Sequence, residues 1–477
     1  MKILVLGGGQ VGASVAEVLA AQDHDTTIVD SDAGRLSHLA DHLRLRTVAG
    51  NAASPSTLRK AGAEDADLLI AVTQSDETNL VACKLAKSVF NVPTRIARLR
   101  YSEFHSDENL LSEANFAVDH ALCPEELVTA YIARLVTYPE ALQVVDFADG
   151  RVTLVCVPAY EGGLLVGRPL RAMREHFPVG IEARIPVLYR RGRPLLPDGD
   201  TVVEHGDEVF ILAATEVIRP ALRELRRLQQ PVRRIMIAGG GHIGMRVAKR
   251  LERKFEVKII EGSATRAEHL ANVLDDALVL VGDATDEELL AQENIGEMDL
   301  FLALTNDDEV NIMAATLAKQ RGCQRVIALI NRRAYADMVQ GGPIDIGLSP
   351  AQISIGALLA HVRRGDVARV HSLRRGAVEA LEIVAHGDAG SSQVIGRRIG
   401  EIPWPKGVAV AAIVRHLDRQ QMVGVTDEGA GIWYRGDVVT AHHDTVIEPE
   451  DHVIVLCLRR RLVRQVEQLF QVSCAFI

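Results

Sequence analysis

The sequence lacks several features that would place it in a particular class. No uninterrupted apolar run approaches the ~18–20 residues of a membrane-spanning helix, so no transmembrane segment is expected. The formal net charge of −10 argues against a dedicated nucleic-acid-binding protein, which needs a basic surface. The first residues have the pattern of a strand entering a glycine loop, without the apolar centre or cleavage site of a signal peptide. We therefore expect a cytoplasmic protein.

Residues that carry common chemistry are equally sparse. The cysteines are Cys83, Cys123, Cys156, Cys323, Cys457 and Cys474. They have neither the spacing of a metal site nor that of a disulfide framework, and small core residues in a reducing compartment are expected. We find no Ser-His-Asp arrangement and no paired carboxylates at a useful spacing. His205 and His452, at corresponding strand edges, are expected at the surface. The sequence thus predicts no catalytic residue and no metal site.

What the chain does contain is a long internal repeat. Residues 7–12 read GGGQVG and residues 239–244 read GGGHIG, each after an apolar run. Residues 65–87 and 297–319 also match at many positions. The copies lie 232 residues apart, a period far too long for a solenoid of short repeats. With 477 residues, against ~100–200 for an ordinary domain, the chain is expected to hold several domains.

Strand and helix patterns alternate in residues 1–118 and again from 233 to about 340. In the first copy the expected strands are 2–6, 26–30, 45–48, 67–72 and 94–99, and the expected helices lie near 11–22, 32–42, 54–62 and 76–90. This alternation predicts a parallel sheet covered by helices on both faces, the doubly wound Rossmann-like α/β fold.

A different segment follows each copy. The segment from Asp119 is expected to form a helix through about Thr137, and that from Asp345 a helix through about Arg364. Pro124 and Pro350 suit a first helical turn, where the missing N–H costs nothing. Each helix has an apolar face that needs cover. The sequence leaves open whether its own domain covers it or whether it is shared in a dimer.

Two smaller β-rich segments come next, at 141–214 and 377–458. They correspond to each other in short stretches: 166–170 with 394–398, and 201–209 with 445–453. The arginine-rich join at about 217–234 is expected to be a solvated helix and linker. The chain is therefore predicted to repeat one pair of domains, with boundaries at 1–140, 141–228, 229–368 and 369–477.

Each glycine sequence stands in the context of a dinucleotide site. It follows a strand, opens a helix and is followed by an acidic residue at the end of the next strand. The first glycine allows a tight turn, the second a close approach of pyrophosphate to the backbone, and the third the packing of helix on strand. Asp30 and Glu261 are expected to accept hydrogen bonds from ribose hydroxyls and to repel a 2′-phosphate, which favours NAD(H) or an adenosine nucleotide over NADP(H). The alternative is a glycine turn that binds nothing. The predicted loop residues are Gly7, Gly8, Gly9, Gln10, Val11 and Gly12, and Gly239, Gly240, Gly241, His242, Ile243 and Gly244.

Further residues are expected at the same sheet edge, where open α/β sheets bind ligands. Asn51 and Asp283 could accept a bond from an adenine amino group. Thr73 and Thr305 end the fourth strand, with helix capping as the alternative. Arg98 could neutralise a phosphate, with surface solvation as the alternative; its counterpart is Ile330, so either the second site lacks this charge or Arg332 supplies it. The predicted residues outside the loops are Asp30, Asn51, Ala52, Thr73, Gln74, Arg98, Glu261, Asp283, Ala284, Thr305 and Asn306.

These motifs resemble the RCK (KTN) domain family. The resemblance rests on the glycine loops, Asp30, the turns at 50–52 and 282–284, and the Thr-x-x-Asp-Glu-x-Asn motif at 73–79 and 305–311. It covers essentially the whole chain and implies two nucleotide-binding RCK-N domains, each followed by a small α+β RCK-C domain. Gln10 and His242 stand where some single-RCK relatives carry an arginine that contacts the terminal phosphate of ATP, which argues against a strict ATP preference.

The family implies a regulatory protein rather than an enzyme: a cytoplasmic gating subunit that binds NAD(H), with ATP or ADP as further candidates, and controls potassium flux. The implied partner is a TrkH-type membrane subunit, which would hold the protein at the inner face of the membrane. Family rings of eight RCK units imply four chains of this length. A cytosolic NAD-dependent oxidoreductase is the main alternative, and an assembly scaffold with vestigial sites is another.

Overall fold

The computed structural model describes residues 1–477 except 23, 43–44, 102, 107, 177–181, 226–230, 333–334, 336–338, 340–341, 363–366, 375, 426–430 and 473–477. The chain forms two compact units, and each draws on both halves of the sequence. The first combines Met1–Ala133 with Val232–Leu358, and the second combines Arg134–Pro231 with Leu359–Ile477. The boundaries expected for four separate domains stay a prediction.

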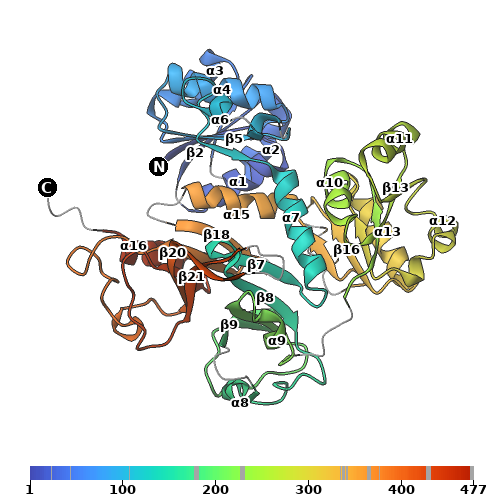
Figure 1. Ribbon diagram of the computed structural model, residues 1–477. Helices are drawn as coiled ribbons and strands as arrows, with labels where there is room; N and C mark the ends of the chain where they lie inside the picture. Colours follow the sequence, from blue (N-terminus) through green and yellow to red (C-terminus); the bar gives the residue numbers. More distant parts are fainter. Residues whose placement is uncertain are drawn as a thin grey trace. The chain divides into compact units, whose positions relative to one another are not determined.

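The first unit contains two six-stranded parallel sheets of the same topology (Figure 1). The strand orders are β3-β2-β1-β4-β5-β6 and β14-β13-β12-β15-β16-β17. The strands of the first are β1 (Lys2–Leu6), β2 (Asp25–Asp30), β3 (Arg46–Ala49), β4 (Leu68–Ala71), β5 (Thr94–Arg98) and β6 (His120–Leu122). Those of the second are β12 (Arg234–Ala238), β13 (Glu256–Glu261), β14 (Leu278–Val281), β15 (Leu300–Ala303), β16 (Arg325–Leu329) and β17 (Ile346–Leu348). In each sheet the direction of winding reverses beside the first strand, which opens a crevice at its carboxyl end.

Helices connect these strands, as the alternating pattern predicts. They are α1 (Gln10–Ala20), α2 (Ala33–His42), α3 (Pro55–Ala61) and α4 (Asp76–Ser88) in the first copy, with the short α5 (Glu103–Ser106) and α6 (Glu108–Leu111). The second copy has α10 (His242–Leu251), α11 (Ala264–Val273), α12 (Glu287–Gln292) and α13 (Asp308–Gln320). The central strands β4 and β15 are entirely buried, as strands covered on both faces must be. The predicted doubly wound α/β class is confirmed for both copies.

The segments expected to open the two long helices instead begin with a strand. β6 and β17 precede α7 (Pro124–Thr137) and α15 (Pro350–Val362), which start at the two prolines. Asp119 anchors β6 by accepting hydrogen bonds from Arg95 N at 2.6 Å and Arg95 Nη2 at 2.7 Å. Asp345 accepts one from Val326 N at 2.8 Å. Three-residue strands are too short to show an alternating pattern, so the sequence did not reveal them.

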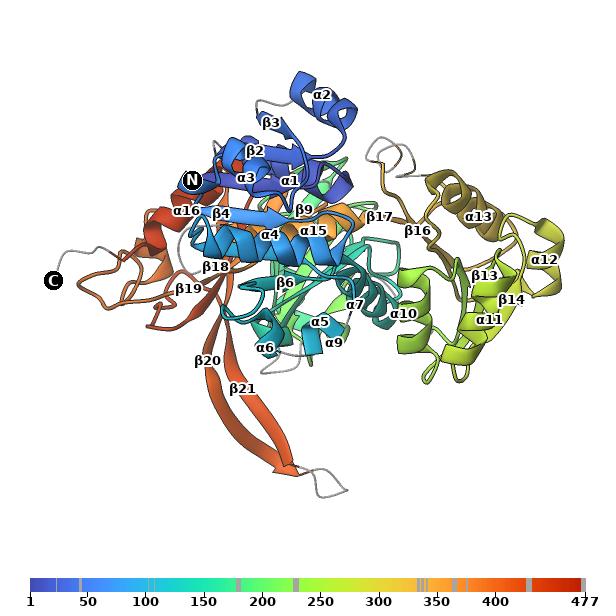
Figure 2. The same cartoon turned by 90° about the horizontal axis from the view of Figure 1, so that it is seen from above.

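Within the first unit, each of these helices lies against the other copy. Figures 1 and 2 show α7 beside α10 and α15 beside α1. Glu126 on α7 forms ion pairs with Arg250 at 2.7 Å and Arg246 at 3.4 Å, both on α10. Arg246 also donates to the carbonyl oxygen of Arg100 at 2.9 Å. The helices are therefore shared between the copies, and the sharing takes place inside one chain.

The second unit contains two five-stranded antiparallel sheets, ordered β10-β9-β11-β8-β7 and β18-β19-β22-β20-β21. Their strands are β7 (Gln143–Phe147), β8 (Val152–Pro158), β9 (Ala183–Arg190), β10 (Arg193–Leu195), β11 (Glu208–Ala214), β18 (Val367–Leu373), β19 (Val378–Val384), β20 (Val408–Val425), β21 (Gly431–Thr440) and β22 (His452–Cys457). Short α-helices accompany them: α8 (Met173–His176), α9 (Ile218–Leu222) and α16 (Val463–Phe470). In Figure 2, β20 and β21 extend as a long hairpin away from the rest of their sheet.

The two sheets share one hydrophobic core. Phe147 and Phe210 from one half pack in the same buried cluster as Leu373 and Ile454 from the other. Polar contacts accompany this packing: Gln143 Nε2 donates to the carbonyl oxygen of Ser372 at 2.9 Å. Neither β-rich segment therefore buries its apolar face alone.

The correspondence predicted between the β-rich segments is present in the structure. Gly167 N donates to the carbonyl oxygen of Val203, and Gly396 N to that of Ile447, each at 2.8 Å. Both glycines have a positive φ, +82° and +75°, which side chains with a Cβ rarely adopt. The repeat thus extends to local backbone geometry.

Two expectations about surface residues hold only in part. The predicted solvated helix at the join is the short α9: its Arg219 is exposed as expected, but its Ile218, Ala221 and Leu222 are buried. Residues 226–230 of the join lie outside the described residues. His205 is exposed as expected, but His452 is half-buried because its Nδ1 lies 2.7 Å from Oε1 of the buried Glu382. The position of His452 at a strand edge could not predict the contact with Glu382, which lies on another strand.

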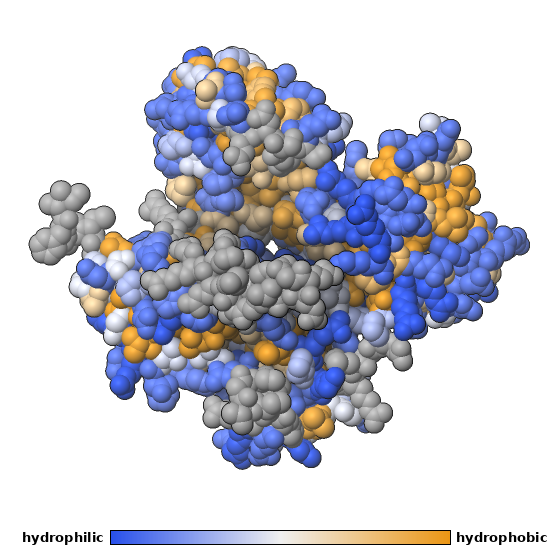
Figure 3. Space-filling model, in the orientation of Figure 1, coloured by the Kyte–Doolittle hydropathy of each residue, from blue (hydrophilic) through white to orange (hydrophobic). Residues whose placement is uncertain are grey.

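The face in Figure 3 is largely hydrophilic, with hydrophobic patches over both nucleotide-binding copies. Val81 on α4 and Met313 on α13, at equivalent positions, are among the exposed large hydrophobic side chains, at 41% and 56%. Among the described residues, no helix is long and apolar enough to span a membrane.

Candidate nucleotide-binding site

The glycine loops have the geometry that their sequence predicts. Gly7 and Gly239 have φ values of +106° and +98°, which a tight left-handed turn requires. A Cβ on Gly12 would lie 1.8 Å from the carbonyl oxygen of Gly7, so only glycine lets the helix pack this closely on the loop. A Cβ on Gly9 would meet no atom within 4 Å, which leaves the backbone open to an approaching ligand. Gly244 and Gly241 repeat these two environments in the second copy.

The predicted ribose-binding carboxylates brace the glycine loops. Asp30 accepts hydrogen bonds from Gly8 N at 2.5 Å and Asp32 N at 2.8 Å. Glu261 accepts from Gly240 N at 2.8 Å and Ser263 N at 2.9 Å. An ionised carboxylate has about four acceptor positions. Each side chain therefore holds its loop in shape and retains acceptor capacity for hydroxyl groups.

A cavity of about 1330 Å³ gathers most of the predicted residues of the first copy. It exceeds the ~300–1,000 Å³ of common small-molecule pockets, so an extended ligand fits. The predicted residues that line it are Gly7, Gly8, Gly9, Gln10, Val11, Asp30, Asn51, Ala52, Thr73, Gln74 and Arg98, together with Gly241, His242, Ile243, Thr305 and Asn306 of the second copy. Its lining does not include the predicted residues Gly12, Gly239, Gly240, Gly244, Glu261, Asp283 and Ala284. The cavity thus contains the first site and reaches only part of the second.

The alternative of helix capping by Thr73 and Thr305 is wrong. The caps are Ser75, which accepts from Thr78 N, and Asp307, which accepts from Val310 N. Thr73 instead donates both its N–H, at 3.0 Å, and its hydroxyl, at 2.7 Å, to Oδ1 of the buried Asn79. The same hydroxyl oxygen accepts from Ser75 N at 3.4 Å, and Thr73 lines the cavity.

Asn51 and Asp283 each stabilise the turn that follows the third strand of their copy. Asn51 Oδ1 accepts from Ala53 N at 2.8 Å, and Asp283 Oδ1 accepts from Thr285 N and Oγ1, both at 2.8 Å. The Thr285 backbone and hydroxyl hydrogen bonds lower the pKa of Asp283. Asp283 keeps a second oxygen for a ligand, whereas Asn51 has a single side-chain oxygen, which already accepts one hydrogen bond. Their role toward adenine stays a prediction.

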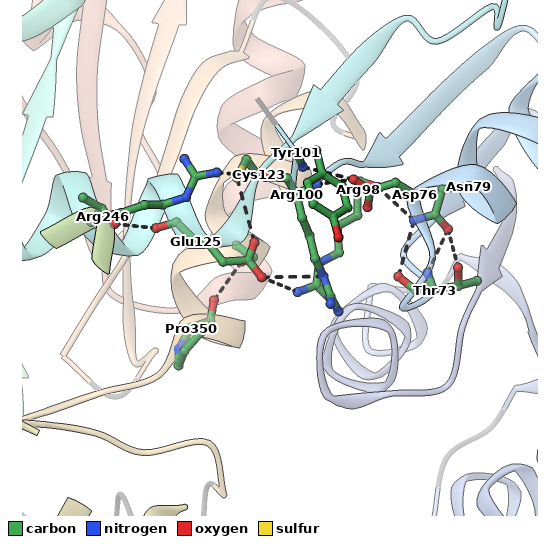
Figure 4. A network of polar contacts seen from close by, with 12 residues as sticks. Thr73, Asp76, Asn79, Arg98, Arg100, Tyr101, Cys123, Glu125, Arg246 and Pro350 are labelled. Atoms are coloured by element: carbon green, nitrogen blue, oxygen red, sulfur yellow. Dashed lines mark hydrogen bonds and ion pairs between the residues drawn. The ribbon is translucent and has the colours of Figure 1, made fainter. Parts of the chain in front are cut away.

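Arg98 is not a solvated surface residue. Its side chain is 14% exposed, and its Nη2 lies 2.8 Å from Glu125 Oε1, with Arg100 Nε 3.7 Å from the same oxygen (Figure 4). The Nε atoms of both arginines are buried and lack a hydrogen-bond partner among the described residues. This end of the first site therefore holds two guanidinium groups and one carboxylate.

The second copy lacks two of these three charges. Ile330 and Ala351 stand at the positions of Arg98 and Glu125, and both are buried. Arg332, the other candidate for the missing charge, stands at the position of Arg100; its side chain is exposed and pairs with Glu309 at 2.8 Å. The two sites consequently differ in charge at the same place.

Several charged or polar residues that line the cavity were not predicted: Arg35, Arg100, Glu125, Arg266 and Asn331. The repeat contained a signal for three of them: Arg100 has its counterpart in Arg332, and the other two are counterparts of each other. Arg35 and Arg266 are separated by the same interval as Asp30 and Glu261, and each follows its acidic residue by five positions. Arg35 Nη1 lies 3.6 Å from Asp30 Oδ2. Glu125 carried no such signal, because its counterpart is alanine.

The described residues hold no group of three or more His, Cys, Asp or Glu side chains that could bind a metal ion. Cys83, Cys156, Cys323 and Cys457 are buried, as expected of small core residues, and Cys123 is half-buried. Burial raises the pKa of Cys83 to about 12, so that thiol stays protonated. Cys474 lies outside the described residues.

Fold and site together define a tandem-repeat protein with two Rossmann-type nucleotide-binding domains and a shared β-rich core. The TrkA-N domain model matches residues 3–124 and 235–350, and the TrkA-C domain model matches residues 154–226. The chain is 50% identical to the Trk system potassium uptake protein TrkA of Vibrio alginolyticus over 478 residues, and 49% identical to that of Halomonas elongata over 476 residues. Both comparisons cover 100% of each chain. The chain belongs to the TrkA family of Trk potassium uptake proteins.

Solved structures share the fold at lower identity. The GsuK RCK domain superposes with a TM-score of 0.60 at 17% identity, covering 98% of this chain and 94% of that one. The GsuK channel bound to NAD gives a TM-score of 0.59 at 17% identity, covering 98% of this chain and 78% of that one. The predicted fold, two doubly wound parallel-sheet domains that are each followed by a small β-rich segment, is thus confirmed.

Proposed function

We propose that this chain is the nucleotide-sensing regulatory subunit of a Trk-type potassium uptake system. The observation that carries the proposal is a glycine loop braced by a buried acidic residue inside a large cavity, in a chain of the TrkA family. A ligand can regulate transport only if it binds two conformations with different affinities. Helices shared between the copies provide elements whose contacts could change with the ligand.

NAD(H) is the proposed ligand of the first site, with ADP and ATP as competitors. The loop N–H groups at the start of α1 would bind the pyrophosphate, favoured by the helix dipole. Asp30 would accept bonds from the adenosine ribose and repel a 2′-phosphate. The structural neighbour solved as the GsuK channel bound to NAD supports this choice. The second site would bind through Glu261 and the loop that begins at Gly239.

The rest of the proposal concerns the assembly. The chain would act without catalysis of its own, at the inner face of the membrane, on a TrkH-type integral membrane subunit. Two RCK units per chain would require four chains for a ring of eight. The names of the full-length relatives, which are potassium uptake proteins, favour transport over the oxidoreductase alternative.

Calorimetry on the purified chain tests ligand binding. We expect NADH to bind at micromolar to low-millimolar concentration, and Asp30→Ala to weaken binding at least tenfold because the loop loses its brace and the ribose its acceptor. Glu261→Ala should affect only the second component of the isotherm. Co-purification with the membrane subunit, with and without NADH, tests the partner. If NAD(H), ATP and ADP all fail to bind, the proposed function is wrong.

A further inference from the structure

At the end of the first site that holds Arg98 and Arg100, a carboxylate of the protein itself already contacts these arginines. Glu125, the second residue of α7, places Oε1 2.8 Å from Arg98 Nη2 and 3.7 Å from Arg100 Nε. All three side chains line the cavity, and Glu125 is only 12% exposed. Figure 4 shows the Glu125 carboxylate directed at the arginines. Guanidinium groups bind carboxylate and phosphate oxygens through the same N–H donors, so Glu125 takes the place of an anionic ligand group.

The topology decides which part of a nucleotide would reach this carboxylate. Asp30 ends β2, the glycine loop follows β1, Thr73 follows β4, Arg98 ends β5, and Glu125 comes after β6. These strands lie in the order β2-β1-β4-β5-β6. A nucleotide with its ribose at Asp30 and its pyrophosphate on the glycine loop therefore extends toward Arg98 and Glu125. The next group there is a second nucleoside in a dinucleotide, or a third phosphate in a nucleoside triphosphate.

The chemistry at this end favours the dinucleotide. Glu125 already accepts from Arg98 Nη2, so a third phosphate would have to compete with this carboxylate for the arginine and would lie close to its charge, in a partly buried place where repulsion is poorly screened. A second ribose is uncharged, and its hydroxyls can donate to Glu125 and to the hydroxyl oxygen of Thr73, whose own hydrogen is directed to Asn79. We infer that Glu125 is a specificity-determining residue that makes the first site prefer a dinucleotide such as NAD(H) to ATP. This inference rests on the proposed function.

The second site provides an internal comparison. Ile330 and Ala351 replace Arg98 and Glu125, and both are buried. A third phosphate there would meet neither this arginine nor this carboxylate. Discrimination by Glu125 is consequently confined to the first site.

The test uses the full chain with Glu125→Gln, which keeps the size of the side chain and removes its charge. Calorimetry with NADH, ADP and ATP is done in EDTA, so that no divalent cation neutralises the phosphates, and in a Glu261→Ala background, so that the first site dominates. We expect ATP to bind roughly tenfold more tightly than without the substitution, because one nearby negative charge is lost. NADH should bind equally well or a few-fold more weakly. Glu125→Asp, which retains the charge, should keep the original ratio of ATP to NADH affinity.

Glu126→Gln is the matched control. Glu126 lies one residue further along α7, pairs with Arg246 and Arg250, and does not line the cavity. Its replacement should leave the ratio of ATP to NADH affinity unchanged. If the unsubstituted chain binds no nucleotide, the proposed function fails and the inference with it. If NADH binds but Glu125→Gln leaves the ratio unchanged, or weakens both ligands in parallel, only the inference is overturned.

Discussion

In each loop, one glycine is expected to matter for ligand binding and another for stability. A methyl group added at the two positions would meet different surroundings. At Gly9 it would face open space at the position where a pyrophosphate must approach; at Gly12 it would overlap the carbonyl oxygen of Gly7 at 1.8 Å. Gly9→Ala should therefore keep the free energy of unfolding within about 1 kcal/mol and weaken nucleotide binding. Gly12→Ala should lower the unfolding free energy by roughly 1–3 kcal/mol or more through overpacking. Urea unfolding and calorimetry on the same preparations measure both.

The second copy supplies the control. Gly241 and Gly244 have the same two environments, so their alanine variants should show the same contrast in stability while leaving the first site's affinity intact. Equal loss of binding and stability in Gly9→Ala would contradict the assignment of that glycine to the ligand.

At the scale of elements, one asparagine per copy ties a helix to two strand ends. Asn79 on α4 is fully buried, accepts two bonds from Thr73, and donates to the carbonyl oxygen of Arg98 at 2.8 Å. Asn79→Ala would leave those groups unpaired, and we expect the free energy of unfolding to fall by about 2–3 kcal/mol. NADH affinity should fall too, since Thr73 and Arg98 both line the cavity. Thermal unfolding and calorimetry would detect both changes.

Asn311 holds Thr305 and the carbonyl oxygen of Leu329 in the same way, at 2.9 Å for Thr305 N and 2.9 Å for the Leu329 carbonyl. Its alanine variant should lose comparable stability without the same loss of affinity at the first site. Ser88→Ala, at the exposed end of α4, should change neither property. A stable Asn79→Ala protein would show that the hydrogen-bonded group is dispensable.

At the scale of the whole molecule, His371 should make the free energy of unfolding depend on pH. This histidine packs against Phe147 of the core that the two β-rich segments share. Its ring meets Phe147 edge-on with centroids 5.1 Å apart, and its Nε2 is buried without a partner among the described residues. Burial, with the nearby Arg369 and Arg134, lowers the pKa of His371 to about 4, against the opposing effect of Asp146 and Glu382. The unfolded chain takes up this proton near pH 6.5, so stability is lost as pH falls from about 6.5 to about 4.

Urea unfolding at pH 7.5 and pH 5 would reveal this dependence. His371→Gln cannot take up the proton and should lose less stability between those pH values than the unsubstituted chain. His205→Gln, which replaces an exposed histidine, should behave like the unsubstituted chain. Identical pH dependence with and without His371 would contradict the prediction.

The sequence predicted the repeated α/β fold and the glycine loops because both depend on local periodicity and on backbone freedom at single positions. Gly7, Gly12 and Asp30 carry those signals themselves. The role of Glu125 could not be predicted, because it depends on strands β5 and β6 bringing that residue to Arg98, 27 positions away. The shared core of the second unit could not be predicted for the same reason. Phe147 and Leu373 lie in ordinary apolar patterns, which show that a residue is buried but not which other segment it packs against.

The exchange of α7 and α15 between the copies makes the chain a covalently joined pair. In two separate polypeptides the same contacts would require association, with a cost in translational and rotational entropy and a population that depends on dilution. Because the two copies are joined in one chain, each meets the other at a high effective concentration that the connecting segments set. The pairing therefore persists however scarce the protein is in the cell. In a symmetric dimer of identical chains, any substitution appears on both sides of the interface. In this chain each copy has its own sequence, so the two sites can differ, as they do at Glu125 and Ala351.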